Sequence, residues 1–334
     1  MSGTRWRAAL VGAGALAAVA VAGPASAEAF SAWSPSAPVS SLPGSHPDVN
    51  TEFLDGCPIL SPDGHSLFIA SNRPVGSVGM LDIWVAHRDD TDEGFGAPVN
   101  LGAPVNSTAN DFCPTPLRGN RLLFVSDRIV PGGCGGADMY LTRWTRAGGW
   151  AAPRNLGCAP NGPNTTAGEA GPSYVARGAG YLFFSSNLSG NSDLYVSTGR
   201  LREGVGAGVA VAELNTPVED ARPNVRRDGL EIVFDSTRSD GGAKGGADIW
   251  TSSRPSLSSA WSAPVNVGIV NTSASETRAS LSGDAETMLF GRAPGPEGST
   301  DIYVTTRDEV EDEVDDEDDD DDEDDDEAGD DDDD

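Results

Sequence analysis

Short runs of alternating apolar and polar residues recur along the chain, each bounded by residues typical of turns. In residues 61–88, "SPDGHSLFIASNRPVGSVGMLDIWVAHR", a Pro-Asp-Gly turn precedes an alternating run at 67–70, and a glycine-rich loop separates it from a second run that begins at Asp82. Alternation that includes β-branched and aromatic residues is typical of strands. The segment therefore predicts two strands, a tight turn before the first and a glycine-rich loop between them.

The same pattern occurs five times. The aspartate that opens the second run stands at Asp82, Asp138, Asp193, Asp248 and Asp301, at intervals of 56, 55, 55 and 53 residues. A further short run precedes each turn, and an aromatic-plus-proline piece follows most copies, as in "GFGAPVNLG" (94–102), "GWAAPRNLG" (149–157) and "SAWSAPVNVG" (259–268). A fixed period of this size indicates a repeated unit, here of four strands.

One four-stranded unit cannot bury both of its faces alone, whereas units arranged radially cover one another. We therefore predict an all-β fold, a five-bladed β-propeller over residues 28–307. The last copy ends at "DIYVTT" without a fourth strand, and "SAWSPSAPVSS" (31–41) resembles "SAWSAPVNVG". We expect this N-terminal strand to join the last blade and close the ring. The third unit is the weakest match, because "GAGVAVAEL" (206–214) lacks the tryptophan.

The repeat "SPDGxxLxFxSxR" followed by "GGxDIW" resembles the TolB-like, or WD40-like bacterial, β-propeller repeat, over residues 31–307. The resemblance implies a scaffold used in binding and, in some members, fused to enzymes. The motif residues themselves are expected to maintain the fold. Arg73, Arg128 and Arg238 end the second strand, so we expect Arg–Asp or Asp–backbone contacts with the five aspartates that open the third.

Both ends of the chain differ from this body. Residues 1–27 have a basic start, a short apolar stretch and a small-residue "ASA" at 25–27, which predicts a signal peptide and export to the periplasm or the extracellular space, with no membrane span after cleavage. Residues 308–334 hold 23 of the 52 acidic side chains and no basic one. We expect this tail to be disordered. It could serve solubility, bind Ca²⁺ weakly, or dock on a basic partner.

Four cysteines in an exported chain favour disulfides. Three pairings are possible. Cys57 and Cys113 occupy the same register in adjacent units, while Cys134 and Cys158 lie in a loop and after the fourth strand of one unit. We therefore predict the pairs Cys57–Cys113 and Cys134–Cys158.

A second register precedes the first strand of each unit: an asparagine, then serine or threonine, and an acid five residues after the asparagine. The copies are "NTEFLD" (50–55), "NSTAND" (106–111), "NTTAGE" (164–169), "NTPVED" (215–220) and "NTSASE" (271–276). The acids Asp55, Asp111, Glu169, Asp220 and Glu276 should ring one mouth of the central channel. In one interpretation each motif holds its own loop by local hydrogen bonds. In the other, converging carboxylates bind Ca²⁺ or catalyse glycoside hydrolysis.

Two residues after each acid stand Cys57, Cys113, Gly171, Arg222 and Arg278. Arg222 and Arg278 would neutralise part of an acidic ring, or could hold a carboxylate or sugar ligand. We find no further catalytic motif, and the acidic body, −7 without the tail, lacks a basic patch for nucleic acid. The sequence therefore favours a monomeric, non-catalytic binding or scaffold module of the cell envelope with a protein or glycan partner and no cofactor. A carbohydrate-active hydrolase is the alternative.

Overall fold

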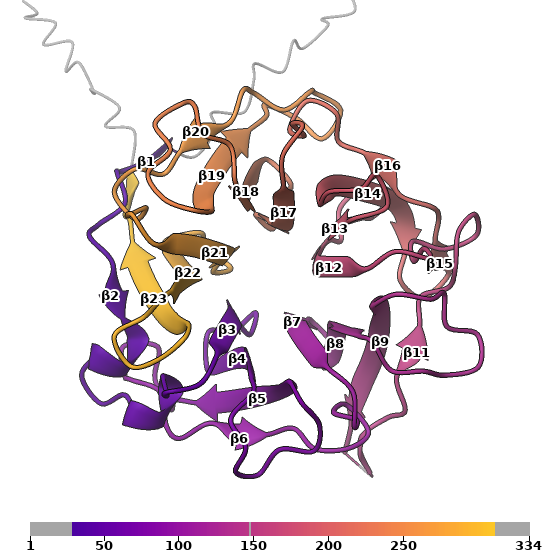
Figure 1. Ribbon diagram of the computed structural model, residues 1–334, viewed down its shortest axis with the longest axis horizontal. Coiled ribbons are helices and arrows are strands. Elements are labelled where there is room, and N and C mark those ends of the chain that lie inside the picture. The colour runs from indigo at the N-terminus through magenta and orange to yellow at the C-terminus, as the bar shows by residue number, and fades with distance from the viewer. Residues whose placement is uncertain (1–28, 147, 311–334) are drawn as a thin grey trace, which may run out of the picture.

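In the computed structural model the chain forms a ring of five β-sheet blades around a central channel (Figure 1). The structure describes residues 29–310 apart from residue 147. The predicted signal peptide at 1–27 and the polyacidic segment from residue 311 lie outside the described residues. The predicted all-β five-bladed propeller is confirmed.

Each blade begins with its innermost strand and continues outward in chain order. The strands of the first two blades are β3 (Asp55–Leu60), β4 (Ser66–Ser71), β5 (Asp82–His87) and β6 (Val99–Asn100), then β7 (Asp111–Leu117), β8 (Arg121–Ser126), β9 (Asp138–Thr145), β10 (Gly149–Trp150) and β11 (Arg154–Asn155). The third and fourth blades comprise β12 (Glu169–Val175), β13 (Tyr181–Ser186), β14 (Asp193–Arg200), β15 (Gly204–Val205) and β16 (Val209–Ala210), then β17 (Asp220–Val225), β18 (Glu231–Ser236), β19 (Asp248–Ser253) and β20 (Val265–Asn266). In the second and third blades the fourth-strand position is divided into two short pieces, both paired with the third strand.

The fifth blade closes the ring with strands from both ends of the chain. It contains β21 (Ser275–Leu281), β22 (Thr287–Ala293), β23 (Asp301–Thr306) and, as its outermost strand, β2 (Ala37–Pro38). The predicted closure by the N-terminal strand is therefore confirmed. Two 3-10 turns, η1 (Val39–Ser41) and η2 (Pro47–Val49), lead from β2 to the first blade.

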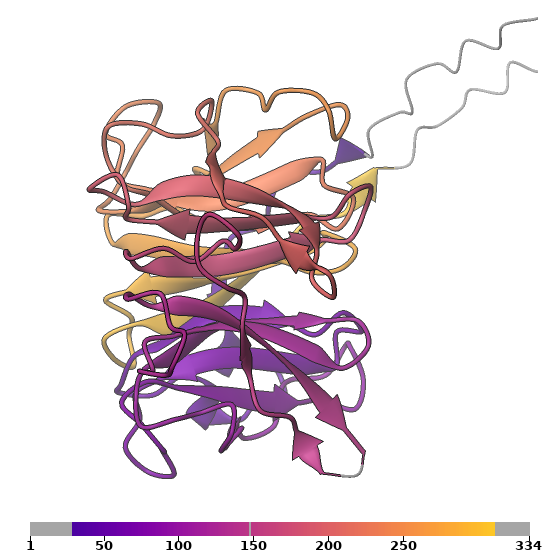
Figure 2. The same cartoon turned by 90° about the vertical axis from the view of Figure 1, so that its right-hand side faces the viewer.

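A second pairing of the two ends was not expected from the sequence. β1 (Ala29–Phe30) pairs with β24 (Glu309–Val310), three residues beyond the boundary predicted at Arg307. Figure 2 shows both strands side by side at one end of the ring axis. This is the end at which the turns between the first and second strands of the blades lie, and we call it the turn end.

The core lies between blades, as radial stacking requires. Phe183 of the third blade, for example, packs in one buried cluster with Ile232, Phe234 and Trp250 of the fourth. The aromatic residue two positions after each third-strand aspartate lies in these layers, and Trp84, Trp250, Tyr140 and Tyr303 are at most 7% exposed. These rings therefore serve packing, as predicted, and offer no exposed binding platform.

The asparagine of each linker joins one blade to the next. Asn106 accepts a hydrogen bond from the N–H of Ile83 and donates to its carbonyl oxygen, both at 2.9 Å. Asn164, Asn215, Asn271 and Asn50 make the same pair of bonds to Met139, Leu194, Ile249 and Ile302. The contact of Asn50 with Ile302 joins the first linker to the last blade, so all five joints are alike.

The third-strand aspartates hold the glycine-rich loops through backbone groups. Asp248 accepts the N–H groups of Lys244 and Gly245 and the side-chain amide of Asn266 on the fourth strand. Asp301 lacks the amide donor, because the closing strand β2 carries Pro38 at that register. One of its carboxylate oxygens is buried without a hydrogen-bond partner. Burial, with smaller contributions from Glu297 and Asp55, raises the pKa of Asp301 to about 7, although the backbone N–H of Glu297 acts in the opposite direction.

We expect Asn106→Ala to lower the free energy of unfolding by about 2–4 kcal/mol, because the substitution leaves a buried N–H and a buried carbonyl without partners. Urea unfolding of the full chain measures this. The exposed Asn161, whose side chain forms no hydrogen bond within the described residues, is the control, and Asn161→Ala should change stability by less than about 0.5 kcal/mol. Equal effects of the two substitutions would contradict the role of the linker asparagine.

Asp301→Asn should weaken the pH dependence of stability. Because the pKa of Asp301 in the folded state lies near 7, above its value of about 4 in an unfolded chain, its contribution is complete below about pH 4 and is lost as the pH rises through 7. Wild-type stability should therefore fall between pH 5 and pH 8 by about 2 kcal/mol more than that of the variant, measured by urea unfolding. Asp248→Asn is the control and should lower stability at both pH values. A variant whose pH dependence matches the wild type would refute this assignment.

Candidate functional site

The five acids of the second register lie inside the linker loops. Each accepts the backbone N–H of the serine or threonine four residues before it, at 2.6–3.1 Å, and the hydroxyl of that residue, at 2.6–2.8 Å. All five are at most 1% exposed. None of them is among the residues that line the channel.

Four of these acids also pair with an arginine of the same blade. Arg73 contacts Asp55, Arg128 contacts Asp111 and Arg238 contacts Asp220, each at 2.5 Å, and Arg292 contacts Glu276 at 2.7 Å. Each guanidinium also lies over the ring of Trp84, Tyr140, Trp250 or Tyr303, 4.1–5.2 Å from its centre. The expected Asp–backbone contacts are therefore present, but the arginines pair with the linker acid and not with the third-strand aspartate.

The third blade departs from this pattern. Leu188 stands where Arg73 and Arg128 stand in the first two blades, and it is 53% exposed. Glu169 consequently receives only the hydrogen bonds of Thr165 and Ser186. Burial raises the pKa of Glu169, and these bonds offset the effect only in part.

The buried carboxylates are held by hydrogen bonds within their own linkers. Asp55, Asp111, Glu169, Asp220 and Glu276 were expected to ring a channel mouth, but their bonds to the linkers turn them away from the opening. In the part of the chain that the structure describes, no group of three or more His, Cys, Asp and Glu residues is placed to hold a metal ion. The geometry thus favours the loop-forming role of these acids.

The channel narrows where each innermost strand carries a β-bulge. The residue two positions after the linker acid adopts a positive φ in every blade, between 45° and 61°: Cys57, Cys113, Gly171, Arg222 and Arg278. We call this ring the waist. A left-handed conformation costs a non-glycine residue roughly 1–2 kcal/mol. Gly171 is required at its position, because a Cβ there would lie 2.6 Å from Cα of Arg222.

The waist brings Arg222 and Arg278 together, as the shared register suggested. Arg222 forms a two-pronged ion pair with Asp235 of β18, while the same carboxylate accepts the backbone N–H of Arg278 at 2.9 Å. Burial lowers the pKa of Arg222, but the charge and hydrogen bonds of Asp235 outweigh it and the net shift is upward. Burial and the charge of Arg222 lower the pKa of Arg278 to about 10. Nε of Arg278 is buried without a hydrogen-bond partner.

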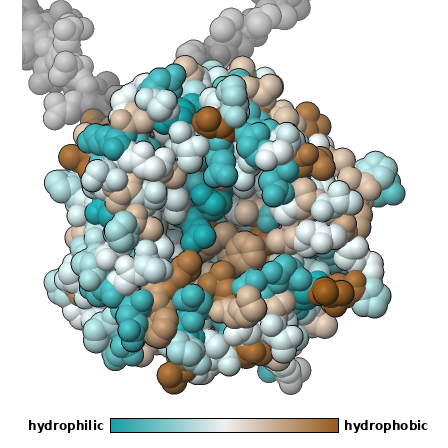
Figure 3. Space-filling model, in the orientation of Figure 1, coloured by the Kyte–Doolittle hydropathy of each residue, from teal (hydrophilic) through white to brown (hydrophobic). Residues whose placement is uncertain are grey.

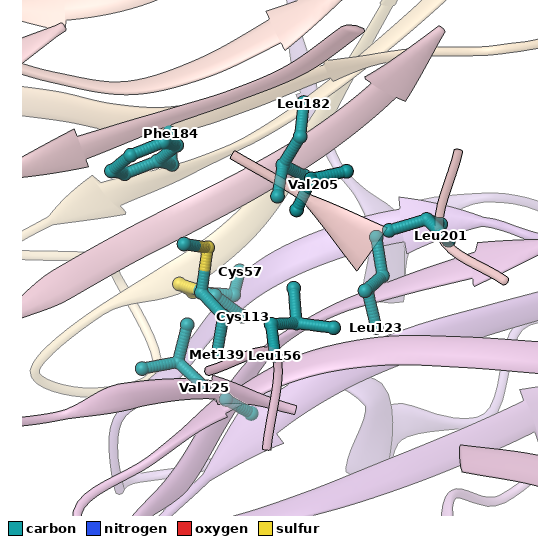
Figure 4. Packing of buried hydrophobic residues seen from close by; sticks show 11 residues of the cluster. Cys57, Cys113, Leu123, Val125, Met139, Leu156, Leu182, Phe184, Leu201 and Val205 are labelled. Atoms are coloured by element: carbon teal, nitrogen blue, oxygen red, sulfur yellow. A yellow bond between two sulfur atoms is a disulfide. The ribbon is translucent and has the colours of Figure 1, made fainter. Parts of the chain in front are cut away.

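Both predicted disulfides are formed, Cys57–Cys113 and Cys134–Cys158. The first joins two waist positions and belongs to a hydrophobic cluster with Val125, Met139 and Leu182 (Figure 4). The second closes the glycine-rich loop of the second blade. Together they fix the side of the ring that contains the first two blades.

Toward the turn end the channel widens into a cavity of about 340 Å³ that shares Ile59, Thr115 and Asn224 with the waist. Its lining contains five arginines and no acidic side chain. We call this set the arginine mouth: Arg118, Arg121, Arg177, Arg226 and Arg227. Aliphatic residues and Tyr174 lie between the arginines.

Most arginines of the mouth have no ion pair within residues 29–310. Arg226 pairs with Asp228, but Arg118, Arg121, Arg177 and Arg227 form no ion pair with any described residue. Two other turn aspartates, Asp63 and Asp284, are held by the hydroxyls of Ser61 and Ser282. The mouth is thus a basic concavity on an acidic body.

The sequence interpretation missed this mouth and the role of Asp235. The signal was present in the turns, where "LRGNR", "ARGAG" and "RRDG" carry arginines around the turn residues in three of the five blades. Asp235 interrupts an otherwise apolar strand in "EIVFDS". Figure 3 shows the opposite end face of the ring, on which hydrophobic and hydrophilic residues are intermixed.

No protein-family model matches the chain, and no curated protein matches it. Similar solved structures include TolB from Acinetobacter baumannii, with 14% identity over 75% of this chain and a TM-score of 0.44; the chain spans 53% of that protein's length. A thermostable family-43 glycoside hydrolase has 12% identity over 78% of this chain and 90% of its own, with a TM-score of 0.50. A family-43 endo-arabinanase from Bacillus licheniformis has 12% identity over 76% and 93%, with a TM-score of 0.49.

At these identities the likeness concerns the fold alone. Fold and channel together define the class of the protein as a five-bladed β-propeller with a basic channel mouth.

Leu188→Arg should supply the third blade with its absent ion pair. A guanidinium beside Glu169 would favour the ionised carboxylate that burial now disfavours, so stability at pH 8 should rise by about 1 kcal/mol in urea unfolding. Leu188→Gln, which adds a polar group without charge, is the control and should leave stability within about 0.5 kcal/mol of the wild type. If both variants behave alike, charge pairing is not what the other four blades gain from their arginines.

Proposed function

We propose that the protein is an exported, non-catalytic binding module of the cell envelope that takes a carboxylate-bearing polymer at the arginine mouth. The observation that carries the proposal is a concave lining with five arginines and no acid in a chain of net charge −30. Carboxylates match the fork of guanidinium donors, and the resulting hydrogen bonds are among the stronger ones in proteins.

Two further observations support this proposal. The linker acids that a hydrolase would need are buried and hydrogen-bonded, so they are not offered to a substrate. The two disulfides support export, because such bonds persist in oxidising compartments. No helix among the described residues has the length and apolar character of a membrane span.

The aliphatic residues between the arginines favour an extended chain as the ligand. Leu60, Leu117 and Leu281 line the same cavity, so a polymer can bury part of its backbone while its carboxylates pair with the rim. An acidic peptide segment of a protein and a uronic-acid glycan share this chemistry. The two sources are separated by the choice of probe.

The proposal predicts that a fluorescent octaglutamate peptide or an oligogalacturonate binds the full chain and that Arg118→Gln, Arg177→Gln and Arg227→Gln together weaken binding about 10-fold or more. Fluorescence anisotropy at low salt measures the dissociation constant, which should rise as salt is added. The probe that binds more tightly identifies the source, and the oligosaccharide should be recovered with its length unchanged.

The control carries Arg143→Gln, Arg146→Gln and Arg202→Gln, three exposed arginines outside the mouth. It changes the net charge by the same amount and should bind like the wild type. Equal weakening in both triple variants, or no binding of either probe to the wild type, would overturn the proposed site. Shortened oligosaccharide would overturn the non-catalytic assignment.

A further inference from the structure

The segment of this chain with the strongest charge complementarity to the arginine mouth is its own C-terminal end. Residues 311–334 contain 21 acidic side chains, interrupted only by Val314, Ala328 and Gly329. The mouth presents five arginines and no carboxylate in its lining, and four of these arginines form no ion pair with a described residue. The most acidic segment and the most basic concavity thus belong to the same molecule.

The last described residues hold the start of this segment at the same end of the ring as the mouth. Glu309 lies opposite Phe30 in the pairing of β24 with β1, and the guanidinium of Arg226, a mouth residue, lies 5.5 Å from the centre of the Phe30 ring. The chain therefore leaves the described fold at the turn end, where the mouth also opens, but at the outer edge of the ring between the fourth and fifth blades (Figure 1).

The attachment of this exit point is firm. Arg307 makes a two-pronged ion pair with Glu231, at 3.0 and 2.6 Å, and lies over the rings of Phe30 and Trp33, 3.9 and 4.3 Å from their centres. Arg307 is thus tied to β18, the second strand of the fourth blade, which carries Glu231. The exit point cannot move away from the mouth without breaking these contacts.

We propose that residues 311–334 bind back into the arginine mouth and act as an internal competitor for its ligand. A chain of this length reaches at most about 80 Å when extended. Its point of attachment lies at the same end of the ring as the mouth, with only Phe30 between Glu309 and Arg226. A short tether to a nearby site gives an effective concentration on the order of millimolar. A free polymer must therefore displace the tail, so only a ligand with several carboxylates, or one present at high local density, can bind.

This inference rests on the proposed function for the identity of the site, but it has a separate readout. The full chain is labelled with ¹⁵N and ¹³C, and the NMR signals of Val314, Ala328 and Gly329 are observed without any added ligand. These three are the only residues of 311–334 that are not acidic, so their signals can be told apart from those of the Asp and Glu residues. The variant Gly329→Ala confirms the assignment of the glycine signal. The comparison is among the wild type, the mouth variant R118Q/R177Q/R227Q and the control variant R143Q/R146Q/R202Q.

Docking predicts that the signals of the wild type and of the control variant are displaced and broadened relative to those of the mouth variant. Adding 0.5 M salt should shift the wild-type signals to the positions seen in the mouth variant, since the contact is electrostatic. Adding octaglutamate should do the same, because the probe and the tail compete.

Identical tail signals in all three proteins overturn the internal competitor. If the probe nevertheless binds at the mouth, the proposed function stands without it. Displaced tail signals that millimolar octaglutamate does not restore to the positions of the mouth variant would retain the tail contact and overturn its role as a competitor for an added ligand. Displacement that is lost equally in the mouth and control variants would show attraction to the overall charge of the turn end, which also overturns a specific site.

Discussion

The propeller depends on the linker that connects one blade to the next. In each linker a buried asparagine amide binds the third strand of the preceding blade, and a buried carboxylate at the start of the following blade binds the linker itself. A buried charge is costly unless it is paired and hydrogen-bonded, and four of the five acids meet this requirement with an arginine from the same blade. The rest of each blade is ordinary strand pairing and apolar packing. The linkers therefore determine how the five sheets are joined, and the first of them closes the ring through the contact of Asn50 with the last blade.

The register of these residues could be predicted from the sequence, and the direction of their side chains could not. Period and alternation predicted five blades, ring closure by residues 31–41 and both disulfides, because a repeated unit repeats its pattern. The same periodicity placed the acids near the channel, but whether a carboxylate faces the opening or its own loop depends on local bonds. The threonine or serine four residues earlier donates two hydrogen bonds to each acid. The carboxylate therefore lies in its own loop and does not face the channel. Likewise the arginines were expected near the third-strand aspartates, yet those aspartates already receive backbone N–H groups.

The five blades differ from one another at the waist and in the third blade. At the waist the same backbone conformation carries two disulfide-bonded cysteines, a glycine and two arginines, so one strained register serves three purposes. A backbone bulge directs these side chains across the channel. Strained positions that persist need support from their surroundings, and here Asp235 holds both arginines from the neighbouring strand. In the third blade Leu188 replaces the arginine, and Ala210 replaces the fourth-strand asparagine. This blade therefore lacks both the ion pair and the amide hydrogen bond found in other blades.

Charge is distributed so that the two ends of the channel differ. At the linker end four of the five acids pair with arginines inside the loops. At the turn end five arginines line a cavity, and Arg226 alone among them forms an ion pair with a described residue. Clustering several guanidinium groups without carboxylates costs free energy through their mutual repulsion, and nothing in the packing of the blades requires it, since the first and fifth blades close the same turns with "SPDG" and "LSGD". Structural need therefore accounts for the linker acids and not for the mouth arginines. Among the described residues only Asp228 forms an ion pair with an arginine of the mouth, so this part of the fold keeps a basic cavity that the packing of the blades does not explain.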